Sequence, residues 1–308
     1  MVTTQSGLAS LLDQLAGGAP ATAVQVAGLS DLGRDDATLL RARWPSIPLA
    51  LREGTLQRAV ELAEDNVDFD FTRLGHVALS DPAPSVRRRA VEVLWESRDR
   101  GVVADLTSRL RTDPDEAVRA TAARILGHVV LAREFDVLDA ATGDDVIEAL
   151  RERAQDSGEA VDVRAGAVES LGPRSLPWVD QIIMDAFYSD DSRLRLAALR
   201  AMGNSASDGY LEFLEEQAAS DDPLFRYEAA LAAGGIASEE AVPFLTTMLT
   251  DEDTEVQFAA VMALGGIGGQ DAVRALENLR PGNRELRDAV EEALAVASEL
   301  ASPREARL

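Results

Sequence analysis

The sequence of 308 residues lacks cysteine and lysine altogether and contains only two histidines. Without cysteine it cannot form disulfides, thiolate metal sites or a cysteine nucleophile. Without lysine it cannot form a P-loop, a lysine Schiff base or the lysine contact of a kinase. No apolar run approaches the roughly 18 to 20 residues of a membrane span, and the first residues lack the basic start and apolar core of a signal peptide. We therefore expect a cytoplasmic location.

Basic side chains are also few in relation to acidic ones. Thirty arginines stand against 54 aspartates and glutamates, which gives a formal net charge of −24. This charge opposes the phosphate backbone of nucleic acids, so we expect neither a nucleic-acid partner nor a membrane partner. The acidic excess is typical of a well-solvated surface. A hydrophobic content of 46% predicts a folded chain and not a disordered one.

One phrase recurs along the chain: an apolar residue, which we call the anchor, followed by Arg, then an Ala or Val at position +4 and an apolar residue at +8. Successive anchors lie 30 to 32 residues apart, except for one interval of 45. Positions 0, +4 and +8 fall within about 80° on a helix, so each phrase predicts an amphipathic helix with one buried stripe. Arg follows the anchor in six of the seven copies, and Gln257 is the exception. The anchors are Val86, Val118, Val163, Leu194, Phe225, Val256 and Leu286.

Each phrase carries start and stop signals for its helix. Asp-Pro pairs beginning at Asp81, Asp113 and Asp222 predict helix starts, since Asp caps a helix and Pro suits its first turn. Glycine at +9 in five copies predicts helix ends. Second amphipathic segments lie between these helices, so each unit is a helical hairpin of about 31 residues that must stack on its neighbours. The five glycines are Gly127, Gly172, Gly203, Gly234 and Gly265.

The pattern of Asp-Pro, Val-Arg, Ala and Leu-Gly in hairpins of this length resembles the HEAT repeat, in the short form found in phycobilisome lyases and bacterial stand-alone repeat proteins. The resemblance covers residues 70–300 and implies an all-α fold, a right-handed α-solenoid of helical hairpins (an α-α superhelix). It also implies ladders of hydrogen bonds between repeats, built from Asp and from the Arg after the anchor. Arg87 and Arg119 each follow an Asp by six residues and are therefore interpreted as structural.

The regularity of the repeats divides the chain. We expect a degenerate N-terminal helical cap in residues 1–69, a repeat array in residues 70–300 and a C-terminal tail in residues 301–308. An irregular end unit is typical of such arrays, because it must expose a face that inner repeats bury. The long interval predicts an insertion near residues 134–156.

The sequence offers no catalytic constellation. His76 and His128 lie in different repeats, and no HExxH or GxSxG spacing is present. The run GGIGG at 265–269 does not follow a strand and is interpreted as a turn between helices. We therefore expect no enzyme activity, no catalytic residue, no bound metal and no cofactor.

The variable positions of the repeat helices are the candidate binding residues. Positions +2 and +6 lie farthest from the buried stripe, and the resemblance implies that these helices line a concave groove. The apolar members form an open binding stripe or bury one another between repeats, and the pattern leaves both open. The candidates are Leu196, Tyr227, Leu231, Phe258 and Met262 in the C-terminal half, and Arg88, Arg89, Arg124 and Trp95 in the N-terminal half.

These features favour a non-enzymatic scaffold that binds a partner protein or peptide on its concave face. The alternative, which the lyase resemblance implies, is a lyase-like or chaperone-like protein that holds a chromophore or another small molecule in the groove. A third class, a HEAT-like DNA glycosylase, is disfavoured because that activity needs a basic groove.

Overall fold

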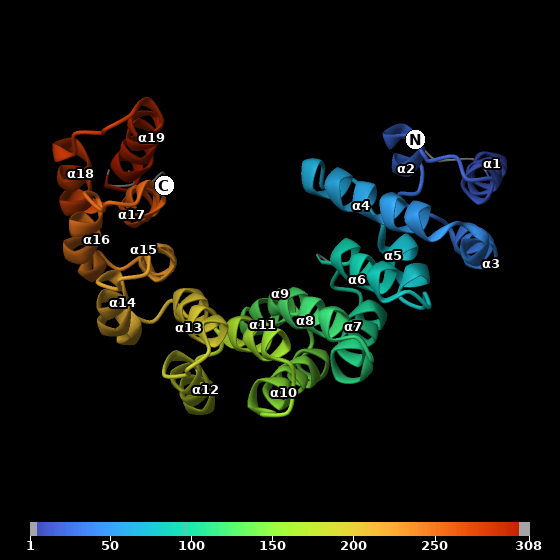
Figure 1. The fold of residues 1–308 in the computed structure, drawn as a ribbon, viewed down its shortest axis with the longest axis horizontal. Coiled ribbons are helices and arrows are strands. Elements are labelled where there is room, and N and C mark those ends of the chain that lie inside the picture. Colours follow the sequence, from blue (N-terminus) through green and yellow to red (C-terminus); the bar gives the residue numbers. More distant parts are fainter. Residues whose placement is uncertain (1–4, 96, 302–308) are drawn as a thin grey trace, which may run out of the picture. The chain divides into compact units, whose positions relative to one another are not determined.

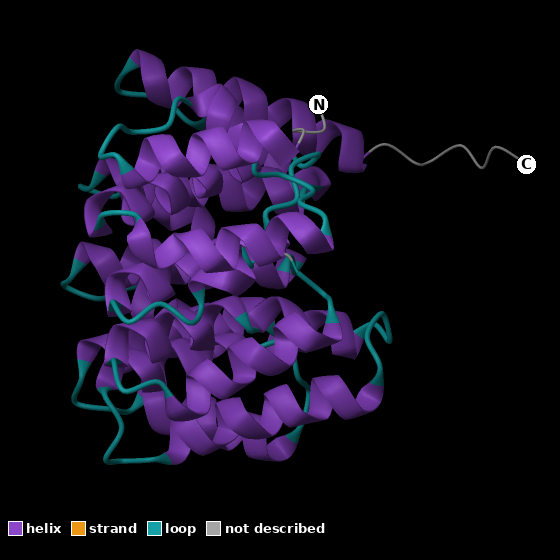
Figure 2. Ribbon diagram, turned by 90° about the vertical axis from the view of Figure 1, so that its right-hand side faces the viewer, coloured by secondary structure: helices purple, strands orange, loops and turns teal. Residues whose placement is uncertain are grey.

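The computed structural model describes residues 5–95 and 97–301, and every regular element in that part of the chain is a helix (Figures 1 and 2). The expected all-α repeat fold is thereby confirmed. Residues 302–308 of the expected tail lie outside the described residues. The chain divides into two compact units, Met1–Ser170 and Leu171–Leu308.

The N-terminal unit opens with four helices that carry no complete copy of the recurrent phrase. Three hairpins follow, each with a first helix and a second helix that contains an anchor. The longest interval between anchors contains an extra short helix, α9, which stands between the second and third hairpins. The helices are α1 (Gln5–Ala16), α2 (Ala23–Ala27), α3 (Arg34–Arg43), α4 (Leu49–Asp65), α5 (Thr72–Ala78), α6 (Pro84–Val93), α7 (Arg100–Thr112), α8 (Glu116–Ile125), α9 (Gly127–Glu134), α10 (Ala140–Gln155) and α11 (Val161–Leu171).

The C-terminal unit consists of four hairpins without an extra helix. Within it, Figure 1 shows the first helices α14, α16 and α18 in one row and the second helices α15, α17 and α19 in another. The second helices pack on one another in chain order. Its helices are α12 (Pro177–Phe187), α13 (Ser192–Asn204), α14 (Leu211–Ala218), α15 (Pro223–Ile236), α16 (Val242–Met248), α17 (Thr254–Ile267), α18 (Gly269–Asn278) and α19 (Arg284–Ala301).

The predicted buried stripe forms the core of every hairpin. All seven anchors expose 4% of their surface or less, and the residues at +4 are buried as well. In six of the seven hairpins, all except α10–α11, the contacts between helices show the second helix packed against its own first helix. Burial of such side chains contributes about 25 cal/mol per Å² of apolar surface to the free energy of folding. The recurrent apolar residues therefore stabilise the array.

Two positions before the anchor carry an acid in several repeats, and these acids have different roles. The acid three residues before the anchor caps the helix: Asp222 accepts from the N–H of Leu224 at 2.9 Å, and Asp253 accepts from Glu255 at 2.8 Å. The acid five residues before the anchor serves the ladder between repeats. The expected helix starts at Asp81-Pro82 and Asp113-Pro114 are therefore two residues early, because α6 begins at Pro84 and α8 at Glu116.

The ladder joins the Arg after one anchor to the acid that opens the next repeat helix. Nε and Nη2 of Arg87 donate to both carboxylate oxygens of Asp113 at 2.8 and 2.7 Å, and Nη1 donates to the carbonyl of Asp81 at 3.0 Å. Arg226 makes the same bidentate contact with Asp251, with both distances 2.8 Å. Such fork-to-carboxylate pairs are among the stronger protein hydrogen bonds. The interpretation of these arginines as structural agrees with this geometry.

Three rungs of the ladder, those of Arg164, Arg195 and Gln257, differ because the acceptor position of the next repeat is not an acid; after Arg164 it is Ser189. The residue in the acceptor position after Arg195 is Ser220, and the guanidinium of Arg195 lies instead over the Phe225 ring, 5.0 Å from its centroid. After Gln257 the acceptor position is Pro281. The amide of Gln257 therefore keeps only the bond within its own repeat, to the carbonyl of Asp251 at 2.6 Å.

The glycines at +9 are not the left-handed helix stops that the sequence pattern predicts. None of the five has a positive φ, and α13 and α15 continue beyond theirs. Each glycine instead faces the residue at +7 of the next second helix. A Cβ atom on Gly203 would lie 2.7 Å from the Cα of Ala232, and one on Gly234 would lie 3.0 Å from the Cα of Ala263. Glycine therefore recurs because the neighbouring backbone leaves no room for a side chain.

We predict that Arg87→Ala lowers the free energy of unfolding by about 3 kcal/mol, because it leaves the buried carboxylate of Asp113 without its bidentate partner. Arg88→Ala is the matched control on the same helix. Its side chain is 41% exposed and 3.8 Å from Glu92, so we expect a change within about 0.5 kcal/mol. Urea denaturation measures both, and equal effects would contradict the structural role of the ladder.

The difference between wild type and Arg87→Ala should depend on pH. Burial raises the pKa of Asp113, but hydrogen bonds from Arg87 and from the backbone outweigh it and hold this pKa below its ordinary value of 3.8. A carboxyl whose pKa is lower in the folded state stabilises the fold above its unfolded pKa. We therefore expect the full difference at neutral pH and a shrinking difference as the pH falls below 3.8. A difference that grows on acidification would contradict this account.

Alanine substitutions at two helical glycines should have opposite signs. Gly203→Ala places its Cβ against the backbone of Ala232 and should destabilise the fold by about 1–3 kcal/mol. Gly54→Ala lies inside α4 with open space around its Cβ and should stabilise by about 0.5–1 kcal/mol. Thermal or urea unfolding measures both. If the two substitutions shift stability in the same direction, close helix packing is not the reason for Gly203.

Candidate functional site

The predicted apolar stripe lies on α13, α15 and α17, three second helices that pack in succession. Leu231 on α15 and Met262 on α17 occupy equivalent +6 positions and expose 41% and 52% of their surfaces. Leu196, Tyr227 and Phe258 occupy the +2 positions and are half-buried. We call these five residues the C-terminal patch. It combines two exposed apolar side chains with three that are partly covered.

The +2 positions are less exposed than the sequence pattern predicts. Ala120, the +2 residue of α8, exposes only 2% of its surface. Position +2 precedes the close-packing glycine at +9 by seven residues, about two helical turns, so both lie on the same side of the helix. The next second helix packs closely against that side, as it does where Gly203 faces Ala232 and Gly234 faces Ala263. The +6 positions are more open: five of the seven +6 residues are exposed, namely Arg124, Arg200, Leu231, Met262 and Glu292.

Charged side chains occupy the +6 positions on either side of Leu231 and Met262. On α13 the +6 residue is Arg200, whose Nε lies 3.0 Å from Oε1 of Glu228, a side chain that is buried. On α19 the +6 residue is Glu292, which is exposed. In the row of +6 positions, the Arg200–Glu228 ion pair therefore precedes Leu231 and Met262, and the exposed Glu292 follows them.

The three predicted arginines of the N-terminal unit do not form a free basic surface. Arg89 lies 2.8 Å and Arg88 3.8 Å from the carboxylate of Glu92, one turn further along α6. Both line a shallow pocket of about 360 Å³ with residues of α4. Arg124 is exposed on α8. Trp95, which follows α6, exposes 42% of its surface.

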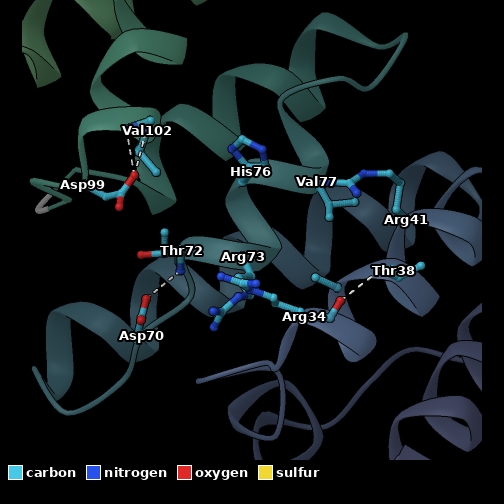
Figure 3. A pocket seen from close by; sticks show the side chains of 12 residues that line it. Arg34, Thr38, Arg41, Asp70, Thr72, Arg73, His76, Val77, Asp99 and Val102 are labelled. Atoms are coloured by element: carbon cyan, nitrogen blue, oxygen red, sulfur yellow. Dashed lines mark hydrogen bonds between the residues drawn. The ribbon is translucent and has the colours of Figure 1, made fainter.

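A larger pocket of about 580 Å³ lies elsewhere in the N-terminal unit, among α3, the start of α5 and the start of α7 (Figure 3). Its lining combines several guanidinium groups with threonine hydroxyls, two aspartates and small apolar side chains. Asp70 and Asp99 turn their carboxylates to backbone N–H groups: Asp70 accepts from Thr72 at 2.8 Å, and Asp99 accepts from Gly101 at 2.8 Å. The polar lining residues are Arg34, Thr38, Arg41, Asp70, Thr72, Arg73, His76 and Asp99.

Sequence reasoning missed the arginines of this pocket, because they belong to no copy of the recurrent phrase. Arg34 and Arg41 lie on α3, and Arg73 lies on α5. One signal was available: Arg34 and Arg41 are seven residues apart, which places both on one side of a helix. The pocket itself arises only when α3, α5 and α7 pack together, and no local pattern encodes that.

The two histidines have structural partners. Nδ1 of His76 lies 3.0 Å from the carboxylate of Asp105. The ring nitrogens of His128 lie 2.6 Å from the carbonyl oxygen of Ile125 and 3.1 Å from that of Ser97, so the ring joins the end of α8 to the segment after α6. Among residues 5–95 and 97–301, no group of three His, Cys, Asp or Glu side chains is placed to hold a metal ion.

Stacked helical hairpins linked by a periodic Arg-to-acid ladder define an α-helical repeat protein. A family model described as HEAT repeats matches residues 72–172 and 211–295. The match covers more than half of the chain, which therefore belongs to the HEAT-repeat family. No curated protein matches the sequence.

Solved structures are similar to this chain at low identity. A chain from the structure of Kap95p bound to RanGDP is 12% identical with a TM-score of 0.52, over 97% of this chain and 46% of that one. YibA of Escherichia coli is 17% identical with a TM-score of 0.45, over 79% and 96% of the two chains. Human deoxyhypusine hydroxylase in complex with glycerol is 18% identical with a TM-score of 0.36, over 95% and 97%. Within the described residues, no helix has the length and apolar character needed to cross a membrane.

The two kinds of patch residue should respond differently to truncation. Tyr227→Ala and Phe258→Ala remove half-buried rings and should each lower the free energy of unfolding by about 1–2 kcal/mol. Met262→Ala removes a side chain that is half exposed and should change it by no more than about 0.5 kcal/mol. Urea unfolding of the three single variants tests this. A loss for Met262→Ala as large as that for Phe258→Ala would show that Met262 is part of the core.

Proposed function

We propose that this protein is a non-enzymatic scaffold that binds a partner protein or peptide at the C-terminal patch. The observation that carries the proposal is the exposure of Leu231 and Met262 at equivalent positions of two packed helices. Solvated second-helix positions elsewhere are mostly charged, for example Glu292. Adjacent exposed apolar side chains mark an interaction site more often than they occur without a role.

The chemistry of the patch favours an apolar anchor on the partner. Met262 has a flexible, polarisable side chain that adapts to different surfaces. The half-buried rings of Tyr227 and Phe258 form the floor on which an apolar side chain would rest. Aromatic residues of this kind contribute strongly at the centre of interfaces. An amphipathic helix or an extended peptide laid across α15 and α17 meets these demands.

The charge of the protein favours a partner segment with basic flanks. The net charge of −24 accelerates association with basic segments and disfavours acidic ones and nucleic acids. Glu292, next in the row after Met262, is a suitable pair for such a basic residue. The proposal includes a cytoplasmic location and no cofactor. It assigns no catalytic role to His76 or His128, since both have structural partners.

A second candidate function is the holding of a small molecule. The cavity that suits it is the pocket among α3, α5 and α7, with about 580 Å³, and not the row of second helices that the lyase resemblance implies. The pocket and the C-terminal patch lie in different units. The two functions are therefore separable by substitution.

The scaffold function predicts that Leu231→Ser with Met262→Ser removes partner capture from a native lysate without lowering thermal stability. The matched control is Tyr188→Ser, which removes an apolar side chain of the same unit that is 69% exposed and outside the patch. Proteins retained by wild type and by the control, but lost with the double variant, are identified by mass spectrometry. If the double variant retains the same set of proteins as wild type, the patch is not the binding surface.

A further inference from the structure

Arginine in this protein is mostly paired with acid or with backbone carbonyls, and the pocket among α3, α5 and α7 is an exception. The side chains of Arg34 and Arg41 form no ion pair or hydrogen bond with any residue in 5–95 or 97–301. Arg43, on the same helix, pairs with Asp13 at 2.5 Å. Both residues are exposed and line the pocket, so their guanidinium groups are open to a ligand that enters it.

The geometry of the pocket directs these groups to one space. Arg34 and Arg41 are two turns apart on α3, and Ala37 and Thr38 between them line the same pocket. Arg73 enters from α5, and its Nη1 donates to the carbonyl oxygen of Leu32. This bond fixes one edge of the guanidinium and leaves its other N–H groups for a ligand. Figure 3 shows Arg34 and Arg73 beside each other, with Arg41 apart from them next to Val77.

The acidic groups near the pocket are already engaged. Asp99 accepts from the N–H groups of Gly101 and Val102 at 2.8 and 3.2 Å, as the cap of α7. Asp70 accepts from the N–H of Thr72. His76 faces Asp105. These acids keep their negative charge, but none of them forms an ion pair with Arg34 or Arg41, so both guanidinium groups keep their N–H donors for a ligand.

We propose that this pocket binds a small molecule through its oxyanion groups, either phosphate or clustered carboxylates. A guanidinium fork matches both groups by paired hydrogen bonds. The volume of about 580 Å³ lies in the range of roughly 300 to 1,000 Å³ that is usual for small-ligand sites. Ala37, Val77 and Val102 supply an apolar wall for the body of the ligand. The inference is independent of the scaffold function, since the pocket lies in the N-terminal unit and the C-terminal patch in the other.

Isothermal titration calorimetry of the full chain at low ionic strength tests the proposal, with inorganic pyrophosphate and citrate as probes. We expect saturable one-to-one binding of at least one probe. Arg34→Ala with Arg41→Ala should weaken it at least tenfold. The matched control is Arg43→Ala with Arg58→Ala, which removes the same charge from exposed ion pairs outside the pocket and should change affinity by less than twofold.

The two probes separate the two chemistries. Tighter binding of pyrophosphate assigns the pocket to phosphate-bearing ligands, and tighter binding of citrate assigns it to polycarboxylates. Circular dichroism melting of each double variant confirms that it is folded. If neither probe binds saturably at millimolar concentration, or if the two double variants weaken binding equally, the pocket is not an oxyanion site.

Discussion

From α8 to α17, each second helix approaches the next one so closely that glycine stands at the contact, and much of the structure depends on this approach. A Cβ atom on Gly203 or Gly234 would lie within 3.0 Å of the next helix. The same approach brings the Arg after one anchor within reach of the acid that opens the next repeat, as in Arg226 with Asp251 at 2.8 Å. It also covers the +2 side of each helix, so that only the +6 side remains for binding. Spacing, ladder and exposed surface are thus consequences of one contact.

The periodic part of the fold was predictable because each recurrent residue determines burial within its own helical hairpin. Anchors such as Val86 and Val256 are fully buried as the 3.6-residue period predicts. The role of the glycines was not predictable, since a glycine near a helix end suits both a left-handed stop and a close contact. Only the neighbouring helix distinguishes the two. The actual end of α15 is Ala237, which adopts a left-handed conformation with a φ of 57°.

The candidate binding residues were predictable to a lesser degree. Leu231 and Met262 are exposed as the pattern indicated, whereas Tyr227 and Phe258 are half-buried. The pocket arginines were missed because the cavity forms between α3, which precedes the hairpins, and the first helices of two hairpins, α5 and α7. In both regions the candidate binding residues depart from the repeat pattern. This fits a division of roles, in which residues at recurrent positions stabilise the array and exposed residues outside the pattern bind. A repeat protein can change such positions at little cost in stability, because each repeat contacts only its neighbours.

The most direct test of this division is a scan of single substitutions through residues 171–301, scored in parallel for folded abundance and for partner capture. The account predicts that changes at recurrent positions such as Arg226, Ala229 and Gly234 lower both scores together. Changes at Leu231 and Met262 should lower capture while abundance stays at the wild-type level. If capture at Leu231 and Met262 merely follows abundance, as it does at Ala229, the exposed exceptions have no binding role and the central claim is wrong.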